Sequence, residues 1–221
     1  MSLYTLHATE RLPFLSIPGG LTFEESDNTA LLAYMGTTSV DNVVKRMAND
    51  HVAYIARINN VPAAFGWVAR GKAVIGELNH EIVLPIGHRY LWNFRTLESF
   101  RGLGIYPALL QHIIREERLK ADSFWIIHAP ENKSSLNGIK KSGFHFVGKL
   151  YSHNGEATIE SSPVSLRYRD ALEEMDIVFS ETSPASCWNC SSPYLKKRNT
   201  MCCCEAAATM CEGKDLRLLM V

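Results

Sequence analysis

Cysteine is missing from residues 1–186, because all six cysteines of the 221-residue chain lie between Cys187 and Cys211. A secreted disulfide framework usually connects a whole fold rather than one end of it. The body of the protein is therefore expected to depend on its hydrophobic core.

The chain also lacks an excess of charge of either sign, since 23 Lys and Arg balance 23 Asp and Glu. This balance argues against a general electrostatic attraction to nucleic acid or to an anionic membrane. No apolar run approaches the roughly 18 residues of a membrane span, and the N-terminus lacks the basic-then-apolar pattern of a signal peptide. We therefore expect a cytoplasmic protein with a small or locally recognised ligand, and neither nucleic acid nor a membrane as partner.

The N-terminal part of the sequence predicts little regular structure before the first helices. Prolines and glycines interrupt residues 1 to about 30, so irregular structure with at most a short edge strand is expected. Two short helical patterns follow between residues 28 and 49, and Ser39 or Asp41 could cap the second. Two β-rich runs in residues 51–70 then predict a hairpin.

Two further strands are predicted without a helix between them, which implies antiparallel pairing. The first covers residues 73–84, and its alternation would place Glu77 and Glu81 on one face and His80 on the other. These three side chains are further candidate catalytic groups, but they could then not all serve one site. The second strand covers residues 89–97.

The stretch "SFRGLGIYPALL", residues 99–110, begins the best helix of the sequence. Pro107 suits its first turn, and an apolar stripe continues along it. A strand, a shorter helix and a final strand follow at residues 123–129, 132–143 and 144–151. This order predicts that the sheet becomes parallel where the long helix crosses over.

The two glycines of this stretch have two interpretations. Gly102 and Gly104 could only permit a tight turn, or they could let the backbone approach an anion that the first helical turn binds. Arg101 would add a positive charge there. The stretch is neither a Walker loop nor a dinucleotide fingerprint, because the following Lys-Ser/Thr and the third glycine are missing.

About thirty residues later, "NKSSLNGIKKSGFHFVG" begins with Asn132 and contains Gly143-Phe144 before a strand. The two motifs, and the distance between them, resemble those of the GNAT superfamily of N-acetyltransferases. The resemblance covers roughly residues 25–160. The resemblance implies an α+β fold of mixed α/β character with three layers. Its central mixed, mostly antiparallel sheet has splayed fourth and fifth strands and is flanked by helices. We expect this acetyltransferase domain in residues 1–160, followed in residues 161–221 by a closing strand or helix and a Cys-rich tail.

The resemblance also implies that the cofactor is acetyl-CoA, bound between the fourth and fifth strands. The loop amides would bind the pyrophosphate, the fourth strand would pair with the pantetheine, and the residues after the fifth strand would touch the CoA arm. The residues so assigned are Phe94, Arg95, Thr96, Arg101, Gly102, Leu103, Gly104, Ile105, Tyr106, Pro107, Asn132 and Ser135. Two of them depart from the family pattern, because Tyr106 replaces a small residue and Pro107 has no N–H to donate.

Acetyl transfer from a thioester needs an amine that has lost a proton and benefits from an acid for the thiolate. Many family members supply this acid with a tyrosine four residues before the Gly-Phe pair, where this chain has Ile139. His128, at the end of the fifth strand, could take the ammonium proton, or could only satisfy a hydrogen bond there. Tyr90 stands where some histone-type members have a glutamate base. A tyrosine at this position could act as an acid or could only pack against the substrate.

The tail contains a Cys-x-x-Cys pair, a cysteine triplet and one further cysteine. Four thiolates can hold zinc tetrahedrally, and the candidate ligands are Cys187, Cys190, Cys203 and Cys211. Buried free thiols and redox-labile surface thiols are the alternatives.

The main hypothesis is an N-acetyltransferase that transfers an acetyl group from acetyl-CoA to the amine of a small molecule or a peptide. The absent tyrosine motivates an alternative, a catalytically silent module that binds or senses acyl-CoA. A third hypothesis is a remnant of the fold without a CoA site. The oligomeric state stays open between a monomer and a homodimer.

Overall fold

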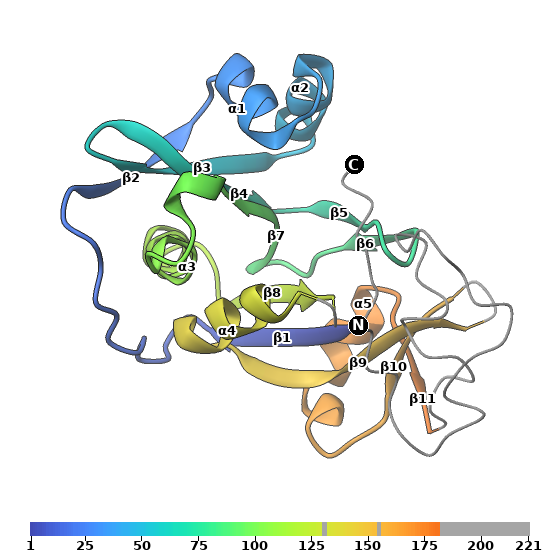
Figure 1. Cartoon of the computed structure of the whole chain (residues 1–221). Helices are drawn as coiled ribbons and strands as arrows, with labels where there is room; N and C mark the ends of the chain where they lie inside the picture. The colour runs from blue at the N-terminus through green and yellow to red at the C-terminus, as the bar shows by residue number, and fades with distance from the viewer. Residues whose placement is uncertain (130–131, 154–155, 182–221) are drawn as a thin grey trace, which may run out of the picture.

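The structure is a computed structural model, and it describes residues 1–129, 132–153 and 156–181 (Figure 1). Within these ranges a nine-stranded sheet has the order β11-β10-β9-β1-β8-β7-β4-β3-β2, and β5 and β6 form a separate two-stranded sheet. The strands are β1 (Ser2–His7), β2 (Leu21–Ser26), β3 (His51–Ile58), β4 (Val61–Ala69), β5 (Lys72–Ile75), β6 (His80–Val83), β7 (His88–Thr96), β8 (Ser123–His128), β9 (His145–His153), β10 (Glu156–Glu160) and β11 (Val178–Ser180). The helices are α1 (Thr29–Gly36), α2 (Val40–Ala48), α3 (Ile105–Glu117), α4 (Lys133–Ser142) and α5 (Arg169–Glu174), with short 3₁₀ turns at Glu98–Phe100 and Ser165–Tyr168.

Helices cover both faces of the sheet, which gives three layers. Alternate residues of β3 show this, because Tyr54 packs in one hydrophobic cluster with α3 while Ala53 and Ile55 pack in another with α1 and α2. In Figure 1, α1 and α2 lie on the opposite side of β3 from α3. The sheet is mostly antiparallel, and its parallel pairs are β7 with β8 and β10 with β11. The predicted fold class is therefore confirmed.

The two helices predicted between residues 28 and 49 are α1 and α2. The Asn28 side chain accepts a hydrogen bond from the backbone N–H of Leu31 at 2.9 Å, and Ser39 accepts one from Asn42 at 3.2 Å. Each cap satisfies an N–H that the first helical turn leaves unpaired. The expectation that Ser39 caps the second helix is confirmed.

The expectation for the N-terminus was right in part, since β2 is a short edge strand, but β1 is an internal strand. Strand β1 pairs antiparallel with β8 on one side and with β9 on the other, while the edges of the sheet are β2 and β11. Leu3, Tyr4 and Leu6 are buried. Six residues are too few for a clear periodic pattern, and the prolines that interrupt the sequence lie beyond this strand.

The single strand predicted for residues 73–84 is in fact the β5–β6 hairpin. The chain turns through Gly76 and Asn79, whose φ of +50° lies in the left-handed region that asparagine tolerates. The backbone N–H of Asn79 donates to the carbonyl of Gly76 at 3.2 Å and closes this turn. The alternation argument for Glu77, His80 and Glu81 therefore does not apply, because the turn separates Glu77 from the other two.

Residues 161–181 continue the fold described so far. The 3₁₀ turn and α5 lead into β11, which pairs in parallel with β10. Leu172, Met175 and Ile177 pack in the cluster that also holds residues of β9 and β10. No helix in the described ranges is long and apolar enough to cross a membrane.

Candidate functional site

Strands β7 and β8 separate near their C-terminal ends. They pair in parallel from His88 with Ser123 to Leu91 with Ile126, and β7 then continues to Thr96 without further pairs to β8. The pairing of β7 with β4 is irregular next to this point, and Asn93 has a φ of +50°. Such a bulge bends a strand and redirects its side chains. The sheet is thus open between β7 and β8.

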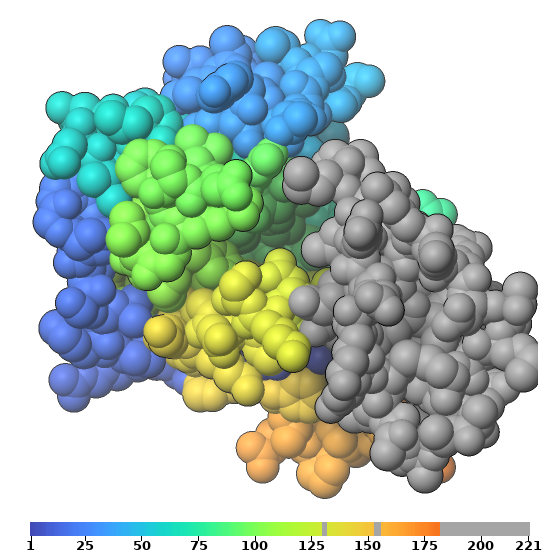
Figure 2. Space-filling view, viewed as in Figure 1, coloured from blue at the N-terminus to red at the C-terminus, as the bar shows by residue number. Residues whose placement is uncertain are grey.

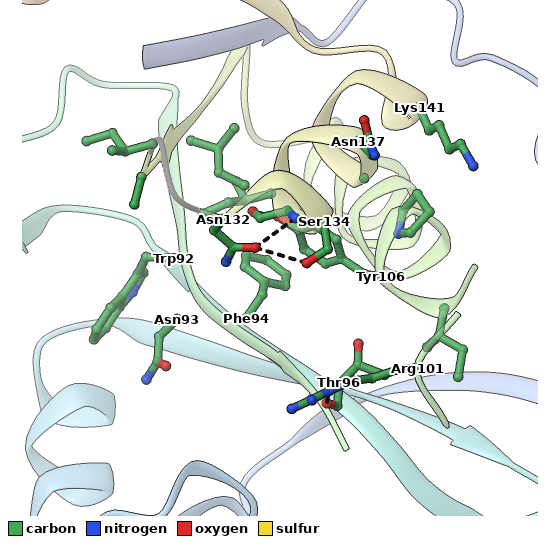
Figure 3. Close-up of a pocket in the computed structure, with 18 of the residues that line it drawn as sticks. Trp92, Asn93, Phe94, Thr96, Arg101, Tyr106, Asn132, Ser134, Asn137 and Lys141 are labelled. Carbon is green, nitrogen blue, oxygen red and sulfur yellow. Dashed lines mark hydrogen bonds between the residues drawn. The ribbon is translucent and has the colours of Figure 1, made fainter. Parts of the chain in front are cut away.

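A cavity of about 790 Å³ occupies this opening and reaches both faces of the sheet. On the α3 face it is lined by the residues before and within the first turn of α3 and by α4, and on the other face by the β5–β6 turn and Tyr90. In Figure 2 the surface is hollowed beside the contact between the green segment that contains α3 and the yellow segment that contains α4. Trp92 and Asn93 lie on one side of the cavity, across from Asn132 and Ser134 of the α4 segment (Figure 3).

The glycine loop forms one end of the cavity. Gly102 and Gly104 have φ values of +80° and +77°, which side chains rarely adopt. Gly104 occupies the N-cap position of α3 but has no side chain to bond the first turn, so the terminus is uncapped and the N–H groups of Ile105 and Tyr106 keep their donor capacity. No heavy atom lies within 4 Å of where a Cβ of Gly102 would be, so there is space at the loop.

Two basic side chains stand at the same end of the cavity. Arg101 Nε donates to the carbonyl of Thr96 at 3.3 Å, and its side chain is 60% exposed. Lys141 of α4 is exposed and also lines the cavity. The uncapped helix terminus and these two cations together make this end suitable for an anion.

Tyr106 fits the loop because its side chain leaves it. The ring packs against Gly138 of α4 and against Phe94, and its hydroxyl lies 3.3 Å from Ser135 Oγ. Burial raises the pKa of Tyr106, so the phenol stays protonated. A tyrosine in place of the usual small residue is therefore compatible with an anion bound to the backbone of the loop.

Asn132 serves as the N-cap of α4. Its Oδ1 accepts from the backbone N–H of Ser135 and from Ser134 Oγ, each at 3.0 Å. These bonds leave the amide nitrogen of Asn132 as the donor available to a ligand. Asn132, Ser134 and Ser135 all line the cavity.

The structure places ten of the twelve predicted cofactor residues on the cavity lining, namely Phe94, Thr96, Arg101, Gly102, Gly104, Ile105, Tyr106, Pro107, Asn132 and Ser135. Arg95 is directed elsewhere, because Nη1 donates to Thr37 Oγ1 at 2.6 Å and to the carbonyl of Met35 at 3.3 Å. Leu103 does not line the cavity, and its side chain is largely exposed.

The two candidate catalytic residues lie in different places. His128 is buried, lies outside the cavity lining, and has Nε2 2.9 Å from the carbonyl oxygen of Asn132. A hydrogen bond at the end of the strand was the non-catalytic role expected for His128. Because a carbonyl oxygen only accepts, Nε2 must carry the proton. Tyr90 lines the cavity, and burial, with the charge of Glu77 adding to it, raises the pKa of its hydroxyl. Ile139 is fully buried in the core, so α4 offers no acid at that position.

The sequence offered Glu77 only as one of three further candidates, with His80 and Glu81, and of these three Glu77 lines the cavity. Glu77 lines it from the β5–β6 turn, and a predicted continuous strand concealed this placement. The pair Gly76 and Asn79, both common in turns, was the signal that could have revealed it. Trp92 lines the same region, and its Nε1 is buried without a hydrogen-bond partner among the described residues.

No group of three or more His, Cys, Asp or Glu side chains suitable for a metal exists in the described residues. The candidate zinc ligands Cys187, Cys190, Cys203 and Cys211 lie outside the part of the chain that the structure describes. The zinc prediction therefore has no support from the structure.

The topology agrees with the GNAT-like fold that the two sequence motifs predict. The splayed parallel pair, the glycine loop before the long helix α3, and the Asn132-capped α4 before β9 occur in the predicted order. The chain therefore has a GNAT-like fold.

Comparisons with known proteins found similarity at the level of structure only. Neither a family model nor a curated protein matches the sequence. A GCN5-related N-acetyltransferase from Kribbella flavida is 15% identical with a TM-score of 0.48, and the match covers 66% of this chain and 53% of that one. The chain thus spans about half the length of this structure. The ribosomal-protein-S18-alanine N-acetyltransferase from Escherichia coli is 16% identical with a TM-score of 0.47, covering 61% and 83% of the two chains. A predicted acetyltransferase with acetyl-CoA from Clostridium acetobutylicum is 16% identical with a TM-score of 0.43, covering 61% and 96%.

Proposed function

We propose that this chain is an acetyl-CoA-dependent N-acetyltransferase that binds acetyl-CoA in the cavity between β7 and β8. The observation that carries this proposal is the uncapped N-terminus of α3, which faces the cavity through a loop with two glycines at positive φ. The N–H groups of Ile105 and Tyr106 would bind the pyrophosphate, with Arg101 and Lys141 adding positive charge.

The remaining lining residues would hold the pantetheine arm. Phe94 and Thr96 lie on the part of β7 that does not pair with β8, so their backbone groups can pair with an amide of the arm. The amide nitrogen of Asn132 and the hydroxyl of Ser135 supply further polar contacts. These contacts would direct the thioester toward the opposite face of the sheet, where Tyr90 and Glu77 line the cavity.

The proposed reaction is direct transfer to an amine. The amine nitrogen attacks the thioester carbonyl, the carbon–nitrogen bond forms, and the carbon–sulfur bond breaks with its electron pair on sulfur. An ammonium nitrogen loses two protons in becoming an amide. One of them protonates the CoA thiolate, and the other goes to solvent. The orphaned Nε1 of Trp92 supports a polar ligand atom in this region, because a buried donor without a partner is costly.

A catalytically silent acyl-CoA-binding module is the second candidate. The buried Ile139 favours it, because the thiolate would find no acid on this part of α4. Both candidates require the cofactor site, and only the first requires turnover.

Calorimetric titration tests the cofactor site. We expect acetyl-CoA to bind with one site per chain, and S-acetylpantetheine, which lacks the pyrophosphate, to bind at least tenfold more weakly. Equal affinity for the two compounds, or no binding of acetyl-CoA, would contradict the proposed binding of the pyrophosphate by the glycine loop.

A further inference from the structure

We infer that Glu77 binds the protonated amine of the acceptor, so that the acceptor is a cationic amine that enters the cavity from the β5–β6 side. This inference rests on the proposed function and adds the acceptor class and the residue that selects it.

The two ends of the cavity carry opposite charges. Arg101 and Lys141 are its basic lining residues in the described chain, and both stand at the α3–α4 end. Glu77 is the one carboxylate among the described lining residues, and it stands on the opposite face of the sheet with Tyr90. An anionic pyrophosphate and a cationic amine would therefore be attracted to different ends, with the thioester between them.

The turn that carries Glu77 is held firmly against the body of the protein. Ile75 and Ile82 are almost fully buried in a cluster with Trp125, and Leu78 packs against the same cluster. The backbone N–H of Leu78 donates to the carbonyl of Ile75 at 3.0 Å. A carboxylate on such a turn has little freedom to leave the cavity, which favours a defined contact with a ligand.

The other ionisable residues of the hairpin have partners of their own. His80 Nε2 lies 3.1 Å from the carbonyl of Met175, and the exposed Glu81 lies 3.7 Å from Lys72 Nζ. Glu77 has no ion pair within 4 Å in the part of the chain that is described. Glu77 is thus the hairpin carboxylate that remains available to a cation.

Tyr90 completes the acceptor end of the cavity. Burial, with the charge of Glu77 adding to it, raises the pKa of Tyr90, so its hydroxyl stays protonated in the cavity that Glu77 also lines. A phenol can both donate and accept a hydrogen bond, and its ring offers an apolar surface to the carbon chain of an amine. The expected acceptor is therefore a primary amine that is protonated at neutral pH and carries an apolar or short carbon chain.

The test compares Glu77→Gln with Glu81→Gln, which removes the same charge from the same hairpin outside the cavity lining. Two probe acceptors are used at pH 7.5: 2-phenylethylamine, which is protonated, and aniline, which is neutral. Acetyl transfer and amine-induced stabilisation of the acetyl-CoA-saturated protein are both measured. We expect the wild type and Glu81→Gln to prefer 2-phenylethylamine, and Glu77→Gln to raise KM for it by tenfold or more with unchanged acetyl-CoA affinity.

Each outcome bears on one of the two proposals. An unchanged KM and unchanged amine stabilisation in Glu77→Gln would overturn the assignment of Glu77. Acetyl-CoA binding without any effect of either amine on the wild type would overturn the cationic acceptor and leave the cofactor site standing. Failure of acetyl-CoA to bind the wild type would overturn the proposed function itself.

Discussion

The ring of Tyr106 fills the space beside Gly138, so a Cβ at position 138 would overlap the ring. Tyr106 belongs to the first turn of α3, and Gly138 lies in the middle of α4. The close approach of the two helices at the cofactor end of the cavity therefore depends on a glycine in α4.

We expect Gly138→Ala to destabilise the protein and to weaken acetyl-CoA binding. The added methyl group displaces Tyr106, and overpacking of this kind costs about 1–3 kcal/mol, partly offset by the better helix propensity of alanine. Urea unfolding and calorimetry measure the two effects. Tyr106→Ala combined with Gly138→Ala should recover part of the affinity, since it removes the overlap. Equal loss in the double variant would show that the ring is not the cause.

Gly102→Ala tests the loop conformation. An alanine at a φ of +80° costs about 1–2 kcal/mol, although no atom obstructs the new methyl group. The loop would relax toward negative φ, so the acetyl-CoA affinity should fall at least fivefold. Gly71→Ala is the matched control, because Gly71 also has open space around it but no positive φ. A similar affinity in both variants would contradict the proposed pyrophosphate loop.

A buried carboxylate at the end of α3 makes stability depend on pH. Glu117, whose side chain is 2% exposed, accepts hydrogen bonds from Arg70 at 2.7 Å, Arg89 at 2.8 Å and Tyr54 at 3.0 Å. Burial alone would raise the pKa of Glu117, but the hydrogen bonds from Arg70 and Arg89 outweigh it and lower the pKa. A lowered folded-state pKa stabilises the fold above the unfolded-state value near 4.3, and this contribution is lost as the pH falls through the lower folded value.

We expect Glu117→Gln to lower the free energy of unfolding at pH 7 by about 3–5 kcal/mol, because it leaves the buried Arg89 without its anion and removes the nearer anion of the partly exposed Arg70. Urea unfolding between pH 7 and pH 3 should show a weaker acid dependence in this variant than in the wild type. Glu116→Gln, at the exposed neighbouring position, should change neither quantity by more than about 0.5 kcal/mol. An acid dependence identical to that of the wild type would show that other carboxylates control it.

His128→Ala separates two roles that remain open for this residue. The hydrogen bond to the Asn132 carbonyl lies at the N-terminus of α4, so we expect the substitution to raise KM for acetyl-CoA through a shift of that helix end. The pH dependence of kcat near neutrality should remain. Loss of the limb between pH 6 and pH 8 in the kcat profile would instead support His128 as the base.

Local patterns predicted most of the fold but not the N-terminal strand or the hairpin. The apolar stripe of α3 and the Ser39 cap of α2 depend on neighbouring residues, so the sequence displays them directly. Strand β1 depends on β8 and β9, which lie more than a hundred residues away in the chain, and six residues cannot show that pairing.

The candidate site also combines features set by neighbouring residues with features set by distant segments. The glycine loop and the Asn132 cap are local, and both could be placed from the sequence. Glu77 reaches the cavity only through the turn between β5 and β6, so its placement needed the three-dimensional fold. The direction of Arg95 toward Thr37 depended likewise on contacts between distant segments.

The most direct test of the account is the release of free CoA thiol from acetyl-CoA, measured with a thiol reagent in the presence and absence of 2-phenylethylamine. We expect thiol release that depends on the amine, saturates with acetyl-CoA and is accompanied by one N-acetylated amine for each thiol. Saturable binding of acetyl-CoA without amine-dependent thiol release, for this amine and for a panel of other primary amines, would contradict the transferase and favour the silent binding module.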